Sequence, residues 1–230
     1  MLSKTPSHTN QQDTTASSPS TIVIGDHTCI NVPMLSVAYM NAQTGAWERY
    51  QCNNGSKKAL KDTGSVTSVK DRQLATRGLV SCMDINLISS TGVIKTHIPP
   101  YMCPTLPGYV GNAPLPGRKD RINIAAFKIA LKTLLSEHRE ELGRFTVEVV
   151  VGYWASPANV VSVLDQLFDV DSCKGTTLST VNGGTAVSGT TRVDLSEGKP
   201  RFFCEEVERV IDVPRREERG SSDVCGLWGC

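Results

Sequence analysis

The longest stretch with sustained apolar periodicity covers residues 122–171. Between 124 and 142, apolar residues recur every three or four positions, which predicts one face of an amphipathic helix. This face contains Ile124, Phe127, Leu131, Leu134, Leu135, His138 and Leu142. Ala, Leu, Lys and Glu favour a helix from about Ala125, and Gly143 is a typical stop. Short alternating runs that begin at Ile122 leave a strand open as an alternative for the start of this segment.

A β-rich run at 144–154 follows the predicted helix and indicates a strand. Its residues of one parity are Phe145, Val147, Val149 and Val151. Glu148 has the other parity, so the face of the strand that carries Glu148 is expected to be at least partly exposed to solvent. Ser156 and Pro157 then have the order of an N-cap and a first helical residue, which predicts a second helix. We expect this helix, strand and helix to supply most of the hydrophobic core.

Two β-hairpins are predicted from turn sequences. One turn lies at 41–45 and ends on a glycine, and the other is Asn-Gly-Gly at 182–184. The predicted strand pairs are 32–40 with 46–52, and 177–181 with 185–193.

Three further segments have weaker patterns. Apolar residues in 66–88 suggest helical character interrupted near Gly78, and a strand at 79–88 is the alternative. The run at 93–98 predicts a strand. The segment 202–213 fits either a final strand or a helix.

The fold class expected from these patterns is α+β, a single domain with antiparallel sheet hairpins packed against two or three helices. Residues 1–20 are polar with almost no apolar content, which predicts a disordered N-terminal tail. The domain is expected at 21–213 and a C-terminal tail at 214–230. Six prolines in 99–117 predict an irregular loop inside the domain.

Composition narrows the range of functions. The 230 residues have a net charge of +1, so the chain as a whole does not attract nucleic acid or anionic membrane. No apolar window approaches the length of a membrane span, and no signal-peptide pattern begins the sequence. We therefore expect an intracellular protein that is not secreted. The eight cysteines form no Cys-x-x-Cys pair, which favours free thiols over a zinc module.

Two short basic groups are candidates for contact with an anionic partner. The first follows a turn and the second closes the proline-rich loop. Together they comprise Lys57, Lys58, Lys61, Arg118, Lys119 and Arg121. A solvated loop is the competing interpretation of the first group.

No sequence motif specifies a reaction, a metal or a nucleotide. His97 and Cys103 are close in sequence and suggest a thiol–imidazole pair, although sequence proximity does not establish geometry. His138 lies on the apolar face of the first predicted helix, where a core or boundary histidine is favoured over a catalytic one. We therefore expect a protein that is not an enzyme, with no cofactor and no metal.

The overall plan resembles the matrix proteins of rhabdoviruses in length, polar tail and single α+β body. Ile122-Asn-Ile-Ala-Ala-Phe-Lys128 is similar to a short segment of that family. Pro104, Thr105, Leu106 and Pro107 resemble the Pro-Thr-Ala-Pro late-domain motif that recruits budding machinery, with leucine at the third position. The strongly basic N-terminus of the family is missing. The resemblance covers under a tenth of the chain.

The resemblance implies a non-enzymatic viral structural protein of matrix type. Such a protein would self-associate under an envelope, contact the viral nucleoprotein and bind the membrane peripherally. It would be found in the virion and in the cytoplasm or nucleus of the host cell. One alternative is a viral coat or movement protein that binds nucleic acid through the two basic groups. Another is a cysteine hydrolase that uses Cys103 and His97.

Overall fold

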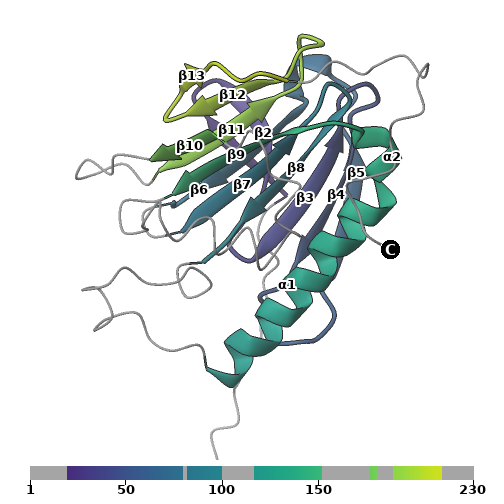
Figure 1. Cartoon of the computed structure of the whole chain (residues 1–230), viewed down its shortest axis with the longest axis vertical. Helices are drawn as coiled ribbons and strands as arrows, with labels where there is room; N and C mark the ends of the chain where they lie inside the picture. Colours follow the sequence, from purple (N-terminus) through teal and green to yellow (C-terminus); the bar gives the residue numbers. More distant parts are fainter. Residues whose placement is uncertain (1–19, 80–81, 100–116, 152–176, 181–188, 214–230) are drawn as a thin grey trace, which may run out of the picture.

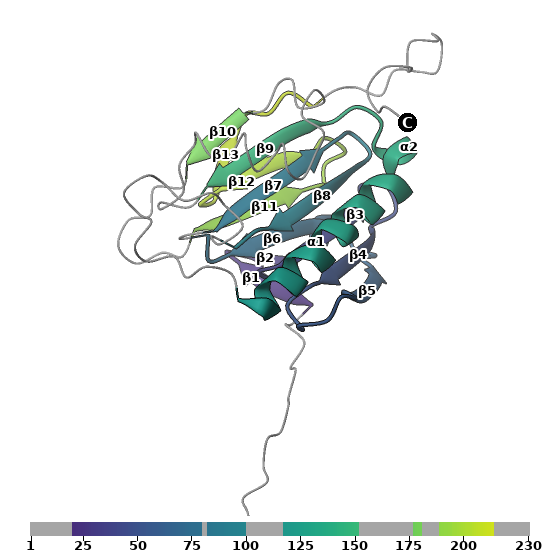
Figure 2. The same cartoon turned by 60° about the horizontal axis from the view of Figure 1, so that its bottom comes forward.

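The computed structural model describes residues 20–79, 82–99, 117–151, 177–180 and 189–213. Within them, two β-sheets pack face to face, and one long helix covers the outer face of the larger sheet (Figures 1 and 2). The fold is therefore α+β and rich in sheet, as the sequence predicted. The described helices are α1 (Arg118–Glu137) and the four-residue α2 (Arg139–Leu142).

The seven-stranded sheet has the order β10-β9-β7-β8-β3-β4-β5. Its strands are β3 (Ser36–Asn41), β4 (Ala46–Gln51), β5 (Leu60–Ser65), β7 (Met83–Ile88), β8 (Gly92–His97), β9 (Thr146–Val151) and β10 (Thr177–Thr180). All neighbours are antiparallel except β9 and β10, which are parallel.

The six-stranded sheet has the order β1-β2-β6-β11-β12-β13. Its strands are β1 (Thr21–Ile24), β2 (His27–Asn31), β6 (Gln73–Arg77), β11 (Thr190–Asp194), β12 (Arg201–Cys204) and β13 (Val207–Arg209). A single 3-10 turn, η1 (Val69–Asp71), precedes β6. Here too one pair, β2 with β6, is parallel. The expectation of antiparallel hairpins is thus met for most strand pairs but not for two.

The first predicted helix is confirmed, and it begins earlier than expected. Ile122 and Ile124 lie inside α1, so the alternative of a strand there is wrong. Gly143 ends α2 with a φ of 57°, a left-handed conformation that glycine adopts without strain. Phe127, Leu131 and Leu134 are buried on the face that the periodicity predicted.

The hairpin around 41–45 and the strands β8 and β9 are also confirmed. In the first turn Gly45 has a φ of 71°. Oδ1 of Asn41 accepts hydrogen bonds from the backbone N–H groups of Gln43 and Thr44. These contacts are the Asx-type turn chemistry that favours Asn and Gly at such positions.

The remaining predictions are wrong, met in part or outside the described residues. The second hairpin does not form, because β10 joins the seven-stranded sheet while β11 joins the six-stranded one. The segment 66–88 holds η1, β6 and β7 rather than a broken helix, so the strand alternative was closer. The segment 202–213 contains a hairpin of β12 and β13. The predicted helix after Ser156 and the proline-rich loop at 100–116 lie outside the described residues, as do 1–19 and 214–230.

Among the described residues, most of the core lies in two layers, and residues 122–151 supply only part of it. The layer between α1 and the seven-stranded sheet draws on that segment, as predicted. From the described part of that segment, 122–151, the layer between the two sheets takes only Val150 among its buried apolar residues. Its other members include Met40, Leu74, Val193 and Phe202. The sequence pattern emphasised the helix because its stripe is long, whereas the second layer is built from short strands far apart in the chain.

Candidate functional site: a basic surface at the start of the long helix

The two predicted basic groups are brought together at the N-terminal end of α1. The backbone N–H of Gly55 donates a hydrogen bond of 2.8 Å to Oδ1 of Asn123, which is 4 % exposed. This contact ties the loop between β4 and β5 to the first turns of the helix. Lys57 and Lys58 follow in the same loop, and Arg118, Lys119 and Arg121 lie in the tied turns.

Gly55 lies in close contact with the side chain of Lys119. It has a φ of 71°, and a Cβ atom added there would lie 3.0 Å from Cε of Lys119. The Lys119 stem therefore lies along the loop backbone. Within the loop, the Asn54 side chain accepts the Ser56 N–H and donates to the Lys58 carbonyl. These local bonds fix the loop that carries the lysines.

We call Lys57, Lys58, Arg118, Lys119 and Arg121 the helix-start surface; all five residues are exposed. Asp120 lies among them, and its carboxylate accepts the Gly117 N–H at 2.9 Å. Five cations and one carboxylate leave a net positive charge. The unsatisfied N–H groups of the first helical turn have the same sign. Chemically, this surface can bind phosphate or carboxylate groups of a partner.

Lys61, the sixth predicted contact residue, does not join this surface. Its ammonium lies 2.5 Å from Oε2 of Glu48 and 5.1 Å from the ring centroid of Tyr50. The hydrogen bond to Glu48 is the main cause of its raised pKa, and a bond to Tyr50 adds to it. The Lys61 charge is thus largely compensated within the protein.

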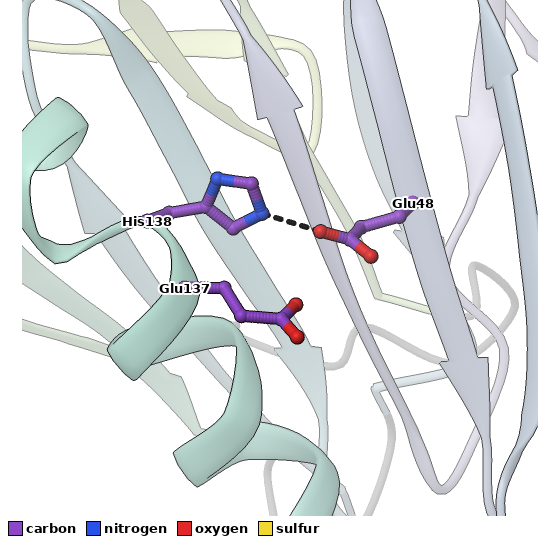
Figure 3. A group of neighbouring side chains, drawn as sticks. All are labelled: Glu48, Glu137 and His138. Atoms are coloured by element: carbon purple, nitrogen blue, oxygen red, sulfur yellow. Dashed lines mark hydrogen bonds and ion pairs between the residues drawn. The ribbon is translucent and has the colours of Figure 1, made fainter.

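A second polar group, the helix-end cluster, lies at the other end of α1. Nε2 of His138 contacts Oε1 of Glu48 on β4 (Figure 3). Nδ1 of His138 lies 3.2 Å from Oε2 of Glu141. The imidazole stacks on Tyr39 with the ring centroids 3.5 Å apart. Burial alone would raise the pKa of Glu48, but hydrogen bonds from Lys61 and His138 outweigh it and lower the pKa. His138 is therefore the satisfied boundary histidine that the sequence suggested.

The helix-end cluster also contains a set of atoms of metal-ligand type. One ligand atom each from Glu48, Glu137 and His138 lie within 4.8 Å of one another. Figure 3 shows the two carboxylates and the imidazole directed toward one region. Lys61 already contacts Glu48 and would compete with a cation there. The arrangement is better explained as a set of side-chain contacts that hold the C-terminal end of α1 on the seven-stranded sheet.

A third polar group, the inter-sheet cluster, comprises Asp84, Asn86, Lys95 and Thr191. The Lys95 ammonium donates to Asp84, to Asn86 at 2.9 Å and to Thr191 at 2.7 Å. Thr191 also donates to Asp84. Both Lys95 and Asp84 are 0 % exposed. Burial lowers the pKa of Lys95, and the Asp84 carboxylate opposes that shift.

His97, the imidazole of the suggested thiol–imidazole pair, lies beside this cluster. It is 4 % exposed, and its Nδ1 lies 3.3 Å from the Val32 carbonyl. Burial lowers its pKa to about 4, and the nearby Asp84 opposes that shift. Neither the burial nor the pKa suits a general base for an external substrate. Cys103 lies outside the described residues, as does the motif Pro104 to Pro107.

The predicted free thiols are confirmed at three described positions. Cys29, Cys52 and Cys204 are buried free thiols, and Cys82 is also buried. Burial raises the pKa of Cys29 and of Cys52 to about 12. These thiols are therefore poor nucleophiles at neutral pH.

Sequence analysis missed the inter-sheet cluster altogether. The only available signal was alternation in Met83-Asp-Ile-Asn-Leu87. Such alternation normally marks a strand with one wet face, so the buried partners were not expected.

Comparison with protein-family models gave no match, and comparison with curated protein sequences gave no significant one. Among the described residues, no helix has the length and apolar character needed to cross a membrane.

Proposed function

We propose that this chain is a non-enzymatic viral structural protein of matrix type. It self-associates, binds a membrane surface peripherally and links that surface to the viral nucleoprotein. It acts in the virion and inside the host cell, without a cofactor. The sequence resemblance motivates this proposal, and the helix-start surface is the observation that supports it most.

The helix-start surface supports contact with an anionic partner because the fold assembles it from remote segments. Lys57 and Lys119 are more than sixty positions apart in sequence, yet the bond between Gly55 and Asn123 holds their segments together. Clustered cations of this kind are attracted to anionic headgroups, at about 1 kcal/mol for each Lys or Arg near the surface. The low net charge of the chain makes this local attraction more selective than a generally basic protein would achieve.

The distribution of perturbed groups supports a non-enzymatic role. Lys95 and His97, whose pKa values are lowered by burial, are enclosed between the sheets. A catalytic group must reach its substrate, and these side chains are covered by the six-stranded sheet. The hydrogen bonds of Lys95 and His97 are consistent with a structural role for both residues.

The test is flotation of the full chain with vesicles of phosphatidylcholine alone or with added phosphatidylserine. The wild type is expected to float only with the anionic vesicles and to be released by salt. The variant Lys57→Gln/Lys58→Gln should lose most of this binding. The matched control, Lys70→Gln/Lys199→Gln, removes the same charge from exposed sites on other segments and should float like the wild type.

Two outcomes would count against the proposal. Equal flotation of both double variants would remove the helix-start surface from the account. A chain that ignores anionic vesicles and binds single-stranded RNA in a salt-dependent way would favour the nucleic-acid-binding coat or movement protein instead.

A further inference from the structure

The strand β5 forms one edge of the seven-stranded sheet, and it differs from the other described edges in length. It has six residues, whereas β1, β10 and β13 have four, four and three. Its register with β4 is unbroken from Leu60 to Ser65, and it contains no proline. Short edges, bulges and prolines are the usual protection against strand addition, and β5 has none of them.

The charges of β5 do not protect this edge either. The Lys61 ammonium is turned onto Glu48 at 2.5 Å, and the Asp62 carboxylate accepts a bond of 2.8 Å from Arg49. The partners in these contacts, Glu48 and Arg49, both belong to the neighbouring strand β4. Leu60 adds an apolar side chain that is 47 % exposed. The edge is therefore long and straight, and its charges are directed away from an incoming strand.

The hydrogen-bond pattern shows which backbone groups of β5 point outward. The Val66 N–H donates to the Gly45 carbonyl at 2.9 Å, and the Cys52 N–H donates to the Leu35 carbonyl at 2.8 Å. Because bonded pairs alternate in an antiparallel ladder, Leu60, Asp62 and Gly64 bond to β4. The backbone N–H and C=O groups of the alternate residues, at 61, 63 and 65, face the side of β5 on which no described strand pairs.

We infer that β5 is a self-association edge, on which β5 of a second copy of this chain pairs antiparallel about a two-fold axis at Thr63. This inference rests on the self-association in the proposed function and assigns it to a specific strand. Figure 2 shows β5 at the rim of the sheet, beyond the strands that α1 covers. The result is one continuous sheet across two copies.

The sequence of β5 is complementary to itself in this register. Thr63 lies opposite Thr63 of the second copy, and Lys61 lies opposite Ser65, so all three outward N–H groups find carbonyls. On the other face, Leu60 lies opposite Val66 and Asp62 opposite Gly64. No charged residue faces another. A two-fold axis at Asp62 would instead oppose two carboxylates and use fewer of the outward groups, which disfavours it.

Charge reversal at Thr63 tests the inference by sedimentation velocity on the full chain. Thr63→Glu and Thr63→Lys each place like charges opposite one another at the axis, so each variant alone should associate at least tenfold more weakly than the wild type. An equimolar mixture should recover association, because the opposed charges then attract. The control Thr28→Glu changes an exposed residue of β2, which is not an edge strand, and should associate like the wild type.

The inference is overturned if the wild type remains monomeric at all concentrations, if both Thr63 variants associate like the wild type, or if their mixture gains nothing. Vesicle flotation of the wild type and of Thr63→Glu distinguishes failure of this inference from failure of the proposed function. A monomeric wild type that still floats on anionic vesicles would refute pairing at β5 and leave membrane binding intact. A wild type that pairs at β5 but does not bind vesicles would refute membrane binding and leave the pairing at β5 intact.

Discussion

The two faces of the seven-stranded sheet are built from alternate residues of the same strands, yet they are stabilised differently. The face under α1 is largely apolar apart from Glu48 at the helix end, with Ile85, Leu87 and Ile94 in one cluster with the helix. The face under the six-stranded sheet carries Asp84 and Lys95 among its apolar residues, and both are fully buried. One face therefore depends on apolar burial, whereas the other also depends on matched polar partners.

This difference shows that the buried polar residues Asp84 and Lys95 belong to the core layer between the two sheets and do not mark an accessible site. A buried apolar side chain stabilises by about 1.5–3 kcal/mol without a specific partner. A buried charge costs free energy unless it is paired and hydrogen-bonded. The Lys95 ammonium meets that requirement through three acceptors. The inter-sheet face should thus be more sensitive to the loss of one partner.

The largest expected effect is on the polar face. Asp84→Ala leaves the Lys95 ammonium buried without its carboxylate, so unfolding free energy should fall by about 3–5 kcal/mol. Urea denaturation followed by circular dichroism measures this loss. The double variant Asp84→Leu/Lys95→Met removes both charges and should recover most of the stability. A fall of under about 1 kcal/mol for Asp84→Ala would show that this face is hydrated.

The next effect tests the apolar face. Leu134 is 0 % exposed between α1 and the sheet, and Leu134→Ala should cost about 2–5 kcal/mol through lost burial and a cavity. The matched control is Ile129→Ala, which truncates a residue of the same helix that is 61 % exposed and should cost much less. Equal costs in the same denaturation experiment would contradict the placement of α1.

The third effect depends on pH. The pKa of His97 is lowered to about 4 by burial, whereas an unfolded histidine titrates near 6.5. The unfolded chain therefore binds the proton first, and stability present above pH 6.5 is lost as pH falls toward 4. The loss from this residue should reach about 2 kcal/mol at pH 5. The charged groups that act on His97 are Asp84, which opposes the shift, and Lys95, which adds to it.

The comparison for this prediction is His97→Gln, measured beside the wild type at pH 7.5 and pH 5. The variant is expected to show a smaller drop in unfolding free energy between the two pH values. Parallel curves for the two proteins would mean that His97 is solvated in the folded chain.

The smallest effect concerns the helix-end cluster, which is closer to water. Glu48→Gln removes the acceptor charge for Lys61 and His138, both of which are partly exposed. The Lys61 side chain is 45 % exposed and water screens its pair with Glu48, so the loss should be roughly 1 kcal/mol. Thermal unfolding in low and high salt measures it. A loss as large as that of Asp84→Ala would assign this cluster to the core instead.

Local patterns in the sequence were sufficient to predict several elements. The three-and-four spacing from Phe127 to Leu134 identified the buried face of α1, and the glycine at 45 identified the first hairpin. Both depend on contacts between residues near in sequence, which periodicity and turn chemistry record directly. The basic residues were also identified from sequence, and the structure brings five of the six to one end of α1.

The arrangement of strands into two sheets could not be predicted in the same way. The pairing of β6 with β11 joins Gln73 to Asp194, and no local pattern specifies so distant a partner. Glu148 was expected on a wet face because its strand alternates, but it is 1 % exposed. Alternation shows that a strand has two unlike faces. It does not show whether a second sheet covers the polar one.

The central claim is that charges between the sheets are structural, whereas those of Lys57, Lys58 and Lys119 at the start of α1 are available to a partner. Lysine acylation of the native chain, followed by mass spectrometry of each site, tests this most directly. We expect rapid labelling of Lys57 and Lys58 that slows on phosphatidylserine vesicles, and labelling of Lys95 only after unfolding. Native labelling of Lys95 at the rate of Lys57 would contradict the account.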